Sequence, residues 1–155
     1  MLTQPSFTPA EDKLGNALPS RRDEAWKWTD VRAKASEHAG GLIEHGIPHL
    51  FTEGAVELNL RGDKEMGEGP MSALAEVLET PIYGFTVKQT VTEKPVRLVM
   101  PPCGHTRIQI KLGSRARLHV IEDHRGAAGG FSNIDMAFIV GKGAHLTRTI
   151  ITDDP

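Results

Sequence analysis

The second half of the chain shows a regular alternation of apolar and polar side chains. Ile108, Ile110 and Leu112 are apolar, and the residues before each of them are polar: Arg107, Gln109 and Lys111. A period of two places alternate side chains on opposite faces of a β-strand, so this segment predicts a half-buried strand. The same alternation precedes Gly141, with apolar side chains at Ile134, Met136, Phe138 and Val140.

Each of these strands leads into the same short motif. Residues 112–118 read Leu-Gly-Ser-Arg-Ala-Arg-Leu, and residues 140–146 read Val-Gly-Lys-Gly-Ala-His-Leu, so Gly141 follows Gly113 by 28 residues (141 − 113). A glycine adopts backbone angles closed to other residues, which allows a sharp corner. A second apolar strand follows each motif, at 118–121 and 146–151. The predicted unit is strand, corner, strand.

This repeat has two interpretations. Stacked repeats have periods of roughly 20 to 50 residues, which favours one coil of a parallel β-helix, where each corner passes the chain to another sheet. The other interpretation is a β-hairpin that occurs twice in a sandwich or meander. Two copies favour the solenoid only modestly, and the spacing leaves both interpretations open.

The first half of the chain predicts a mixed segment with short helices. Thr8-Pro9-Ala10-Glu11 is a capping box that begins a helix ending near Gly15, and Ser20 caps a second helix carrying Trp26 and Trp28. Residues 48–54 predict a loop and residues 56–60 a strand. A third helix starts at Pro70 or Ser72, places Leu74, Val77 and Leu78 on one stripe, and stops at Thr80-Pro81.

Strands dominate from Ile82 onward. One strand set has its apolar residues at Phe85, Val87 and Val91, and the next at Val96, Leu98 and Met100. Breaks at 93–95 and at Pro101-Pro102 set the strand ends. We therefore expect a mainly β chain with an α-helical N-terminal segment, divided into residues 1–80 and residues 81–155.

Composition excludes several classes of function. The formal charge of −2 over 155 residues and an aromatic content of 5% argue against nucleic-acid binding. The chain has neither a basic, apolar secretory leader nor a run of about 18 apolar residues that would span a membrane. Cys103 is the only cysteine, so no internal disulfide can form, and a reducing cytoplasm is the expected location.

Candidate chemistry is sparse. Cys103 and His105 are two residues apart after Pro101-Pro102, and both side chains are metal ligands in principle. The run Glu122-Asp123-His124 is the next candidate for a metal site. Neither group completes a set of three or four ligands nearby, so a loop thiol and turn histidines are the simpler interpretation. The glycines at 126–130 lack the Lys-Ser/Thr of a phosphate loop, and neither a nucleophile elbow nor paired catalytic carboxylates occur. We expect no catalytic, cofactor-binding or metal residues, and no enzyme activity.

Residues 18–31 provide a resemblance to a known family. The string Leu-Pro-Ser-Arg-Arg-Asp-Glu-Ala-Trp-Lys-Trp-Thr-Asp-Val resembles the N-terminal motif of the SufD branch of the SufB/SufD family, which assembles iron–sulfur clusters. The family's second hallmark is a right-handed parallel β-helix. The repeat at 107–152 looks like its early coils, and Glu93-Lys94-Pro95-Val96 looks like the entry into that domain.

The resemblance implies a scaffold that holds no cofactor in this segment, the iron–sulfur cluster being the product of the whole complex. Its implied partners are a SufB-type homologue, paired through the β-helices, and a SufC-type ATPase that binds C-terminal helical segments. Cluster-forming residues lie late in the family's β-helices, so none can be carried onto a position before Pro155. We expect this chain to correspond to an N-terminal portion, and to be marginally stable or self-associate through an open coil.

Two other classes remain open from the residues. One is a small cupin-like β-barrel that uses His105 and other histidines to hold a metal ion. The other is a stand-alone β-solenoid binding module with no connection to clusters.

Overall fold

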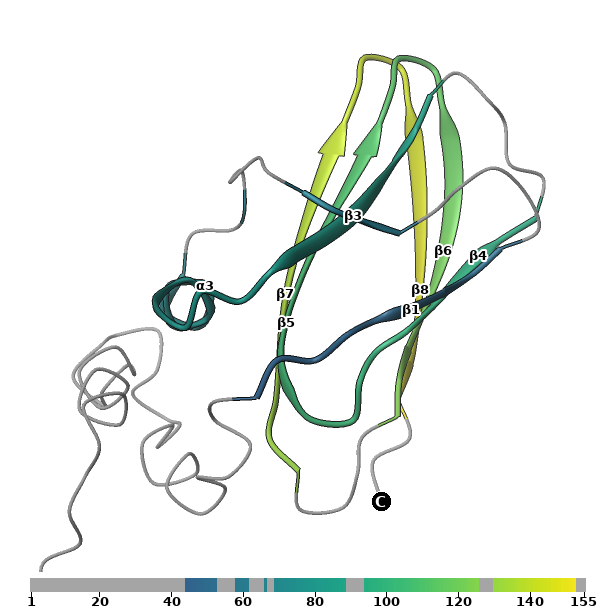
Figure 1. Cartoon of the computed structure of the whole chain (residues 1–155). Coiled ribbons are helices and arrows are strands. Elements are labelled where there is room, and N and C mark those ends of the chain that lie inside the picture. Colours follow the sequence, from purple (N-terminus) through teal and green to yellow (C-terminus); the bar gives the residue numbers. More distant parts are fainter. Residues whose placement is uncertain are drawn as a thin grey trace, which may run out of the picture.

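A computed structural model of the chain shows a mainly β molecule (Figure 1). The structure describes residues 44–52, 58–61, 66, 69–88, 94–125 and 130–152. Within these ranges, one helix and eight strands are present: β1 (His49–Phe51), β2 (Asn59–Leu60), α3 (Pro70–Val77), β3 (Ile82–Val87), β4 (Val96–Val99), β5 (Gly104–Leu112), β6 (Arg117–His124), β7 (Ser132–Val140) and β8 (His145–Thr152).

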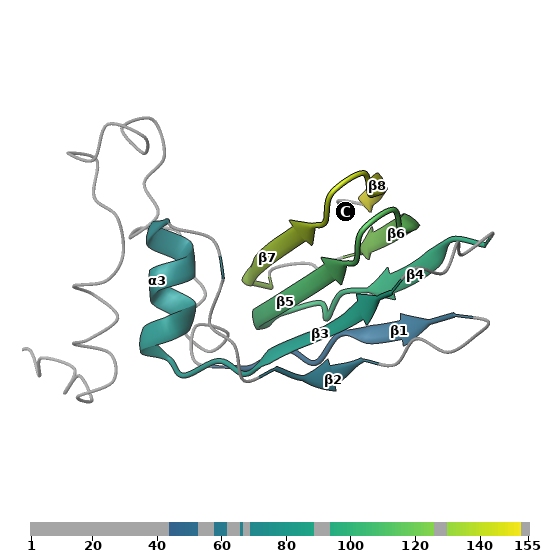
Figure 2. The same cartoon turned by 90° about the horizontal axis from the view of Figure 1, so that it is seen from above.

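The strands form two four-stranded sheets. One sheet has the order β2-β3-β5-β7 and the other has the order β1-β4-β6-β8. In each sheet the last three strands are parallel, and the short first strand is antiparallel to its neighbour. Figure 2 shows β3, β5 and β7 in one row and β4, β6 and β8 in the other. The sheets are mixed and do not close, so the cupin-like barrel does not describe this fold.

The 28-residue repeat corresponds to one layer of strands. Ile108 pairs with Met136 between β5 and β7, and Leu118 pairs with Leu146 between β6 and β8. The turns stack as well, because the Gly141 amide donates to the Leu112 carbonyl at 2.8 Å. Strands β5 and β6 lie in different sheets, so the interpretation of the repeat as a β-hairpin is wrong.

The turn motif matches the close approach of these layers. A Cβ on Gly141 would lie 2.7 Å from the Leu112 carbonyl oxygen and 2.8 Å from the Gly113 carbonyl carbon, so a side chain there would collide with backbone. Ala116, the small residue of the first copy, is fully buried under the turn. Arg115 and Gly143 occupy equivalent positions, and both have positive φ, at 61° and 69°. Glycine adopts that conformation without strain, whereas arginine does so at a cost.

The hydrophobic core lies between the two sheets. Its buried members come from every long strand except β7 and β8, together with the first turn: Phe85, Val87, Val96, Leu98, Met100, Ile108, Ile110, Leu112, Ala116, Leu118 and Val120. The parities predicted for residues 85–87, 96–100 and 108–112 are therefore confirmed. Strands β7 and β8 contribute a partly buried apolar row that packs against this core: Ile134, Met136, Phe138 and Leu146.

Strand β5 departs from the half-buried strand that its alternation predicts. All residues from 104 to 110 are buried on both faces, including Arg107 and Gln109. Arg107 is tolerated because its Nε lies 3.4 Å from the Asp135 carboxylate on β7. Strand β5 lies between β3 and β7, and α3 contacts both β5 and β7. The face that the sequence pattern predicts to be solvated is therefore buried in the folded chain.

Of the other predictions, some are confirmed, one is wrong and several are not tested by the described residues. The helix predicted from Pro70 is confirmed as α3. Residues 49–51 were expected in a loop, but they form β1, because their backbone pairs with residues 97–99 of β4. Of the strand expected at 56–60, the structure describes the pair Asn59–Leu60. The expected helices at 8–14 and from Ser20, with both tryptophans, lie outside the described residues. The division at residue 80 stays a prediction.

Candidate functional site

The sequence motif Cys103-Gly104-His105 does not form one site. The Cys103 thiol points to Glu44, whose Oε2 lies 3.4 Å from the sulfur. Hydrogen bonding to that carboxylate, together with partial desolvation and its negative charge, raises the pKa of the Cys103 thiol. His105 is fully buried, and its Nδ1 accepts a 2.9 Å hydrogen bond from Asn133 Nδ2. The thiol therefore favours its protonated form, and the imidazole belongs to the buried network of the β2-β3-β5-β7 sheet.

The second sequence candidate splits across β6, because adjacent residues of a strand face opposite sides. Glu122 shares the face of Leu118 and Val120, which pack in the core, and it is fully buried. Arg148 on β8 donates to both of its carboxylate oxygens, at 2.6 Å and 2.9 Å, and His124 Nε2 lies 3.1 Å away. The carboxylate raises the pKa of Arg148. This arrangement is an ion pair between a fully buried carboxylate and a partly exposed guanidinium, which neutralises the charge of Glu122.

Asp123 faces the other side of the sheet and carries a separate group of charges. Arg125 donates to both carboxylate oxygens, with Nε to Oδ1 at 2.7 Å and Nη2 to Oδ2 at 2.6 Å. Arg97 Nη2 on β4 donates to the same Oδ2. These bonds hold the pKa of Asp123 well below its usual range, Arg125 being the larger cause. We call Arg97, Asp123 and Arg125 the arginine–aspartate cluster.

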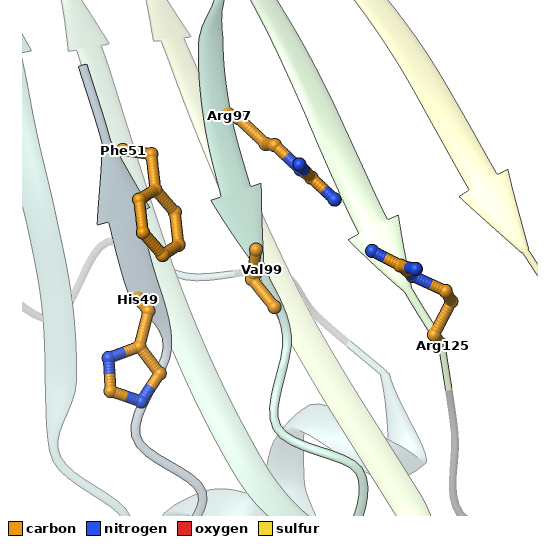
Figure 3. Close-up of a pocket in the computed structure, with 5 residues that line it drawn as sticks. All are labelled: His49, Phe51, Arg97, Val99 and Arg125. Atoms are coloured by element: carbon orange, nitrogen blue, oxygen red, sulfur yellow. The ribbon is translucent and has the colours of Figure 1, made fainter. Parts of the chain in front are cut away.

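An open cavity of about 390 Å³ lies beside this cluster. Its described lining residues are His49 and Phe51 on β1, Arg97 and Val99 on β4, and Arg125 just after β6. Figure 3 shows the guanidinium ends of Arg97 and Arg125 pointing toward one another, with the Val99 side chain between them and the β1 side chains. The cavity thus has two guanidiniums on one side, and Phe51 and Val99 with the His49 ring on the other, a combination that suits an amphipathic anion.

Metal ligation is absent from the part of the chain that the structure describes. In those residues no three His, Cys, Asp or Glu side chains come together as a group that could hold a metal ion. Glu122, Asp123 and His124 take part in ion pairs and hydrogen bonds instead. The described residues also include no helix that is both long enough and apolar enough to cross a membrane.

Two long strand edges form a candidate interface. Strands β7 and β8 are outermost in their sheets and have nine and eight residues, whereas the opposite edges, β1 and β2, have three and two. A strand at a sheet edge presents unpaired backbone groups, and short strands limit that exposure. Val140, Ile150 and Ile151 are also exposed on the long edges. We call β7 and β8 together the open edge.

No local sequence pattern indicates the arginine–aspartate cluster. The run Glu122-Asp123-His124 suggests Asp123 only as a metal ligand, and Arg97 lies on a polar position of a predicted strand without a motif around it. The two meet because Val99 pairs with Asp123 in the parallel register of β4 and β6. That register depends on the lengths of turns and connections, which no local pattern specifies.

Comparison with known proteins finds distant relatives that share one description. The chain is 27% identical over 151 residues to an iron–sulfur cluster assembly SufBD family protein of Mycobacterium leprae (strain TN). It is 26% identical over 156 residues to proteins of the same description from Mycobacterium tuberculosis (strain ATCC 25618 / H37Rv) and Mycobacterium bovis. The similarity is to the SufB/SufD family. Each alignment covers 88% of this chain and 38% of the relative, so the chain spans well under half of their length.

These relatives agree with the family resemblance of the sequence but do not separate SufD from SufB. The aligned region covers most of the chain, so the similarity extends well beyond residues 18–31. No family model matches the chain. No solved structure matches it either.

Proposed function

We propose that this chain is part of a scaffold subunit of the SUF machinery, which assembles iron–sulfur clusters. The observation that carries the proposal is similarity over 88% of the chain to SufBD family cluster assembly proteins. The motif at residues 18–31 favours SufD over SufB within that family. In this proposal the segment is not catalytic and holds no cofactor, and the cluster is a product of the whole complex.

We further propose that β3 to β8 are the first coils of a right-handed parallel β-helix. The support is the 28-residue register, which is the same for β5 with β7 as for β6 with β8. It is also the stacking of the two turns, in which the His145 amide donates to the Ala116 carbonyl at 2.8 Å. In a solenoid each unit packs on its neighbours, so the open edge is where a further unit would continue the stack.

The proposed partners are a SufB-type homologue and a SufC-type ATPase, in the cytoplasm. A scaffold that pairs through β-structure needs long strands with unpaired edges, and the open edge offers strands of this kind. Neither nucleic acid nor a membrane has a place in this proposal, since the chain carries a formal charge of only −2.

The test is co-purification of the protein, expressed from its complete gene, with the SufB-type and SufC-type proteins of the same organism. We expect the three to elute as one complex. We also expect that deleting the gene lowers the activity of enzymes that depend on iron–sulfur clusters. Restoring the gene should return that activity. If the protein associates with neither partner and the deletion leaves those enzymes unchanged, the proposal is wrong.

The alternative function is a β-solenoid binding module unrelated to clusters. The stacked layers and the cavity beside the arginine–aspartate cluster favour it, because neither feature requires an assembly complex. The deletion experiment separates the two functions. If the protein is a stand-alone module, deleting its gene should leave the activity of enzymes that depend on iron–sulfur clusters unchanged. That result, together with evidence that the purified protein folds, would support this alternative.

A further inference from the structure

The arginine–aspartate cluster has a geometry that the scaffold proposal leaves unexplained. Asp123 lies on the outer face of the β1-β4-β6-β8 sheet, yet its side chain is only 1% exposed because two guanidiniums cover it. The side chains of Arg97 and Arg125 themselves are 47% and 55% exposed. Two cations are therefore held side by side at the surface by one carboxylate, which neutralises only one of them.

Asp123 restrains both arginines before any ligand arrives. An arginine loses much rotamer freedom when it is ordered, and this loss normally weakens binding. Here Arg125 is held by two hydrogen bonds and Arg97 by one, so much of that freedom is already lost in the unliganded protein. A site whose donors are ordered in advance binds its ligand more tightly than one assembled on binding.

Arg97 is the main donor in this arrangement. Within the described ranges, Nη2 is the guanidinium nitrogen of Arg97 that has a hydrogen-bond partner, while nearly half of the side chain is exposed. Arg125 has a further partner besides Asp123, so its contribution is chiefly its charge. A guanidinium presents five N–H donors in a planar fork that matches carboxylate and phosphate oxygens. Arg97 therefore retains donors for an anion.

The other side of the cavity carries two apolar side chains, Phe51 and Val99, together with the ring of His49. Phe51 is exposed on β1, and Val99 lies between Phe51 and the arginines (Figure 3). A volume of about 390 Å³ falls in the range of small-molecule pockets, roughly 300 to 1,000 Å³. An exposed aromatic ring beside paired guanidiniums suits a ligand with a charged end and a flat or branched apolar end.

We propose that this cavity binds a small organic anion, namely a phosphate or carboxylate attached to an aromatic or branched apolar group. Arg97 donates hydrogen bonds to the anion, Arg125 adds positive charge, and Phe51 packs against the apolar group. The proposal does not depend on cluster assembly, because its residues lie on β1, on β4 and just after β6, and not on the two strands of the open edge.

The experiment is calorimetric titration of the whole chain with phenyl phosphate and with benzoate, the two anion sources, and with inorganic phosphate and benzyl alcohol as half-ligands. We expect one of the two organic anions to bind at least tenfold more tightly than either half-ligand. Arg97→Gln should weaken that binding roughly tenfold to a hundredfold, because a hydrogen bond to a charged group is lost. Phe51→Ala should weaken binding of the organic anion and leave binding of inorganic phosphate unchanged.

The matched control is Lys142→Gln, which removes one positive charge from an exposed residue in the turn between β7 and β8. It should leave binding unchanged, which separates a site from general attraction to cations. Circular dichroism and thermal melting check that each variant folds, and Arg97→Lys serves if Arg97→Gln does not. Absence of binding by both organic anions, or equal weakening by Arg97→Gln and Lys142→Gln, overturns the proposal. Equal affinity for phenyl phosphate and inorganic phosphate also overturns it.

Discussion

Single residues determine how closely the layers of this molecule approach. The two glycines of the repeated turn occupy equivalent sequence positions, but their surroundings differ. A Cβ on Gly141 would lie 2.7 Å from backbone, whereas a Cβ on Gly113 would meet its nearest atom, the Val87 carbonyl oxygen, at 3.4 Å. Contacts under 3.0 Å with backbone cannot be relieved by a rotamer change, so the two positions should respond differently to the same substitution.

We predict that Gly141→Ala destabilises the protein by about 1 to 3 kcal/mol, because the added methyl overpacks the interface between two turns. Gly113→Ala is the matched control and should cost much less, since its methyl meets ordinary contacts. Urea denaturation measures both free energies of unfolding. Equal losses for the two variants would contradict the stacking of Gly141 on residues 112–114.

A second residue-scale prediction concerns Asp123 and pH. The arginines lower the pKa of this carboxyl in the folded protein, whereas the unfolded chain has the ordinary value of about 3.9. A depressed pKa stabilises the folded state above the unfolded value, and that stabilisation is lost as pH falls through the folded value. Asp123→Asn should therefore be less stable than the parent at neutral pH, and the difference should shrink below about pH 4.

Thermal melts between pH 2 and pH 7 measure this difference. Glu76→Gln is the control, because it removes an exposed carboxylate from α3 that has no recorded ion pair within the described residues. Its effect should be small and should change less with pH. A difference for Asp123→Asn that stays constant down to pH 2 would show that the two arginines do not stabilise the charged carboxylate.

At the scale of elements, one asparagine connects the helix to the sheet. Asn133 on β7 donates from Nδ2 to the Met71 carbonyl of α3 and to His105 Nδ1 on β5, both at 2.9 Å. His105 also contacts Phe131, with ring centroids 5.6 Å apart. These contacts join three elements that are distant in sequence, and they cover the sheet face where Arg107 and Asp135 pair.

We predict that Asn133→Ala destabilises the protein by about 1 to 3 kcal/mol, because it removes a partner from one buried and one partly buried acceptor. Hydrogen exchange should become faster in α3 than in β4, which lies in the other sheet. Ser132→Ala, at the neighbouring exposed position of β7, is the control and should change neither quantity. Unchanged protection of α3 in Asn133→Ala would mean that the helix is held by its apolar contacts instead, through Leu74 and Ala75.

At the scale of the whole molecule, the two ends of each sheet differ among the residues that the structure describes. The edges formed by β1 and β2 are short, whereas the open edge carries eight- and nine-residue strands with exposed apolar side chains. Long, unpaired, apolar edges associate with other chains, because each added strand satisfies backbone groups and buries apolar surface. In isolation this chain should therefore associate through β7 and β8.

We predict that sedimentation velocity of the isolated chain shows association that increases with concentration. The double variant Val140→Lys and Ile150→Lys should shift the chain toward monomer, because lysine on an edge strand opposes pairing. Leu60→Lys changes an even more exposed apolar residue on the opposite edge and should leave association unchanged. A monodisperse monomer with a sharp cooperative melt, for the unmodified chain, would contradict the prediction.

Local pattern determined much of this protein without reference to the structure. The alternation at 96–100 and 108–112 identified the core face of β4 and β5, and the glycine motif identified the layer spacing of 28 residues. The Pro70 start signal located α3. The motif at residues 18–31 pointed to the same family as the relatives found by comparison. These features depend on neighbours within a few residues, or on a period, so a linear sequence contains them.

Only the tertiary structure decided which charges meet and which faces are covered. The alternation predicts a solvated face for Arg107 and Gln109, but both residues are buried in the folded chain, where Arg107 pairs with Asp135 of the neighbouring strand. Glu122 and Asp123 are adjacent in sequence, yet they lie on opposite sides of one strand and pair with different arginines. The physical reason is that contacts between strands 26 to 28 residues apart depend on sheet register, which turns and connections set together.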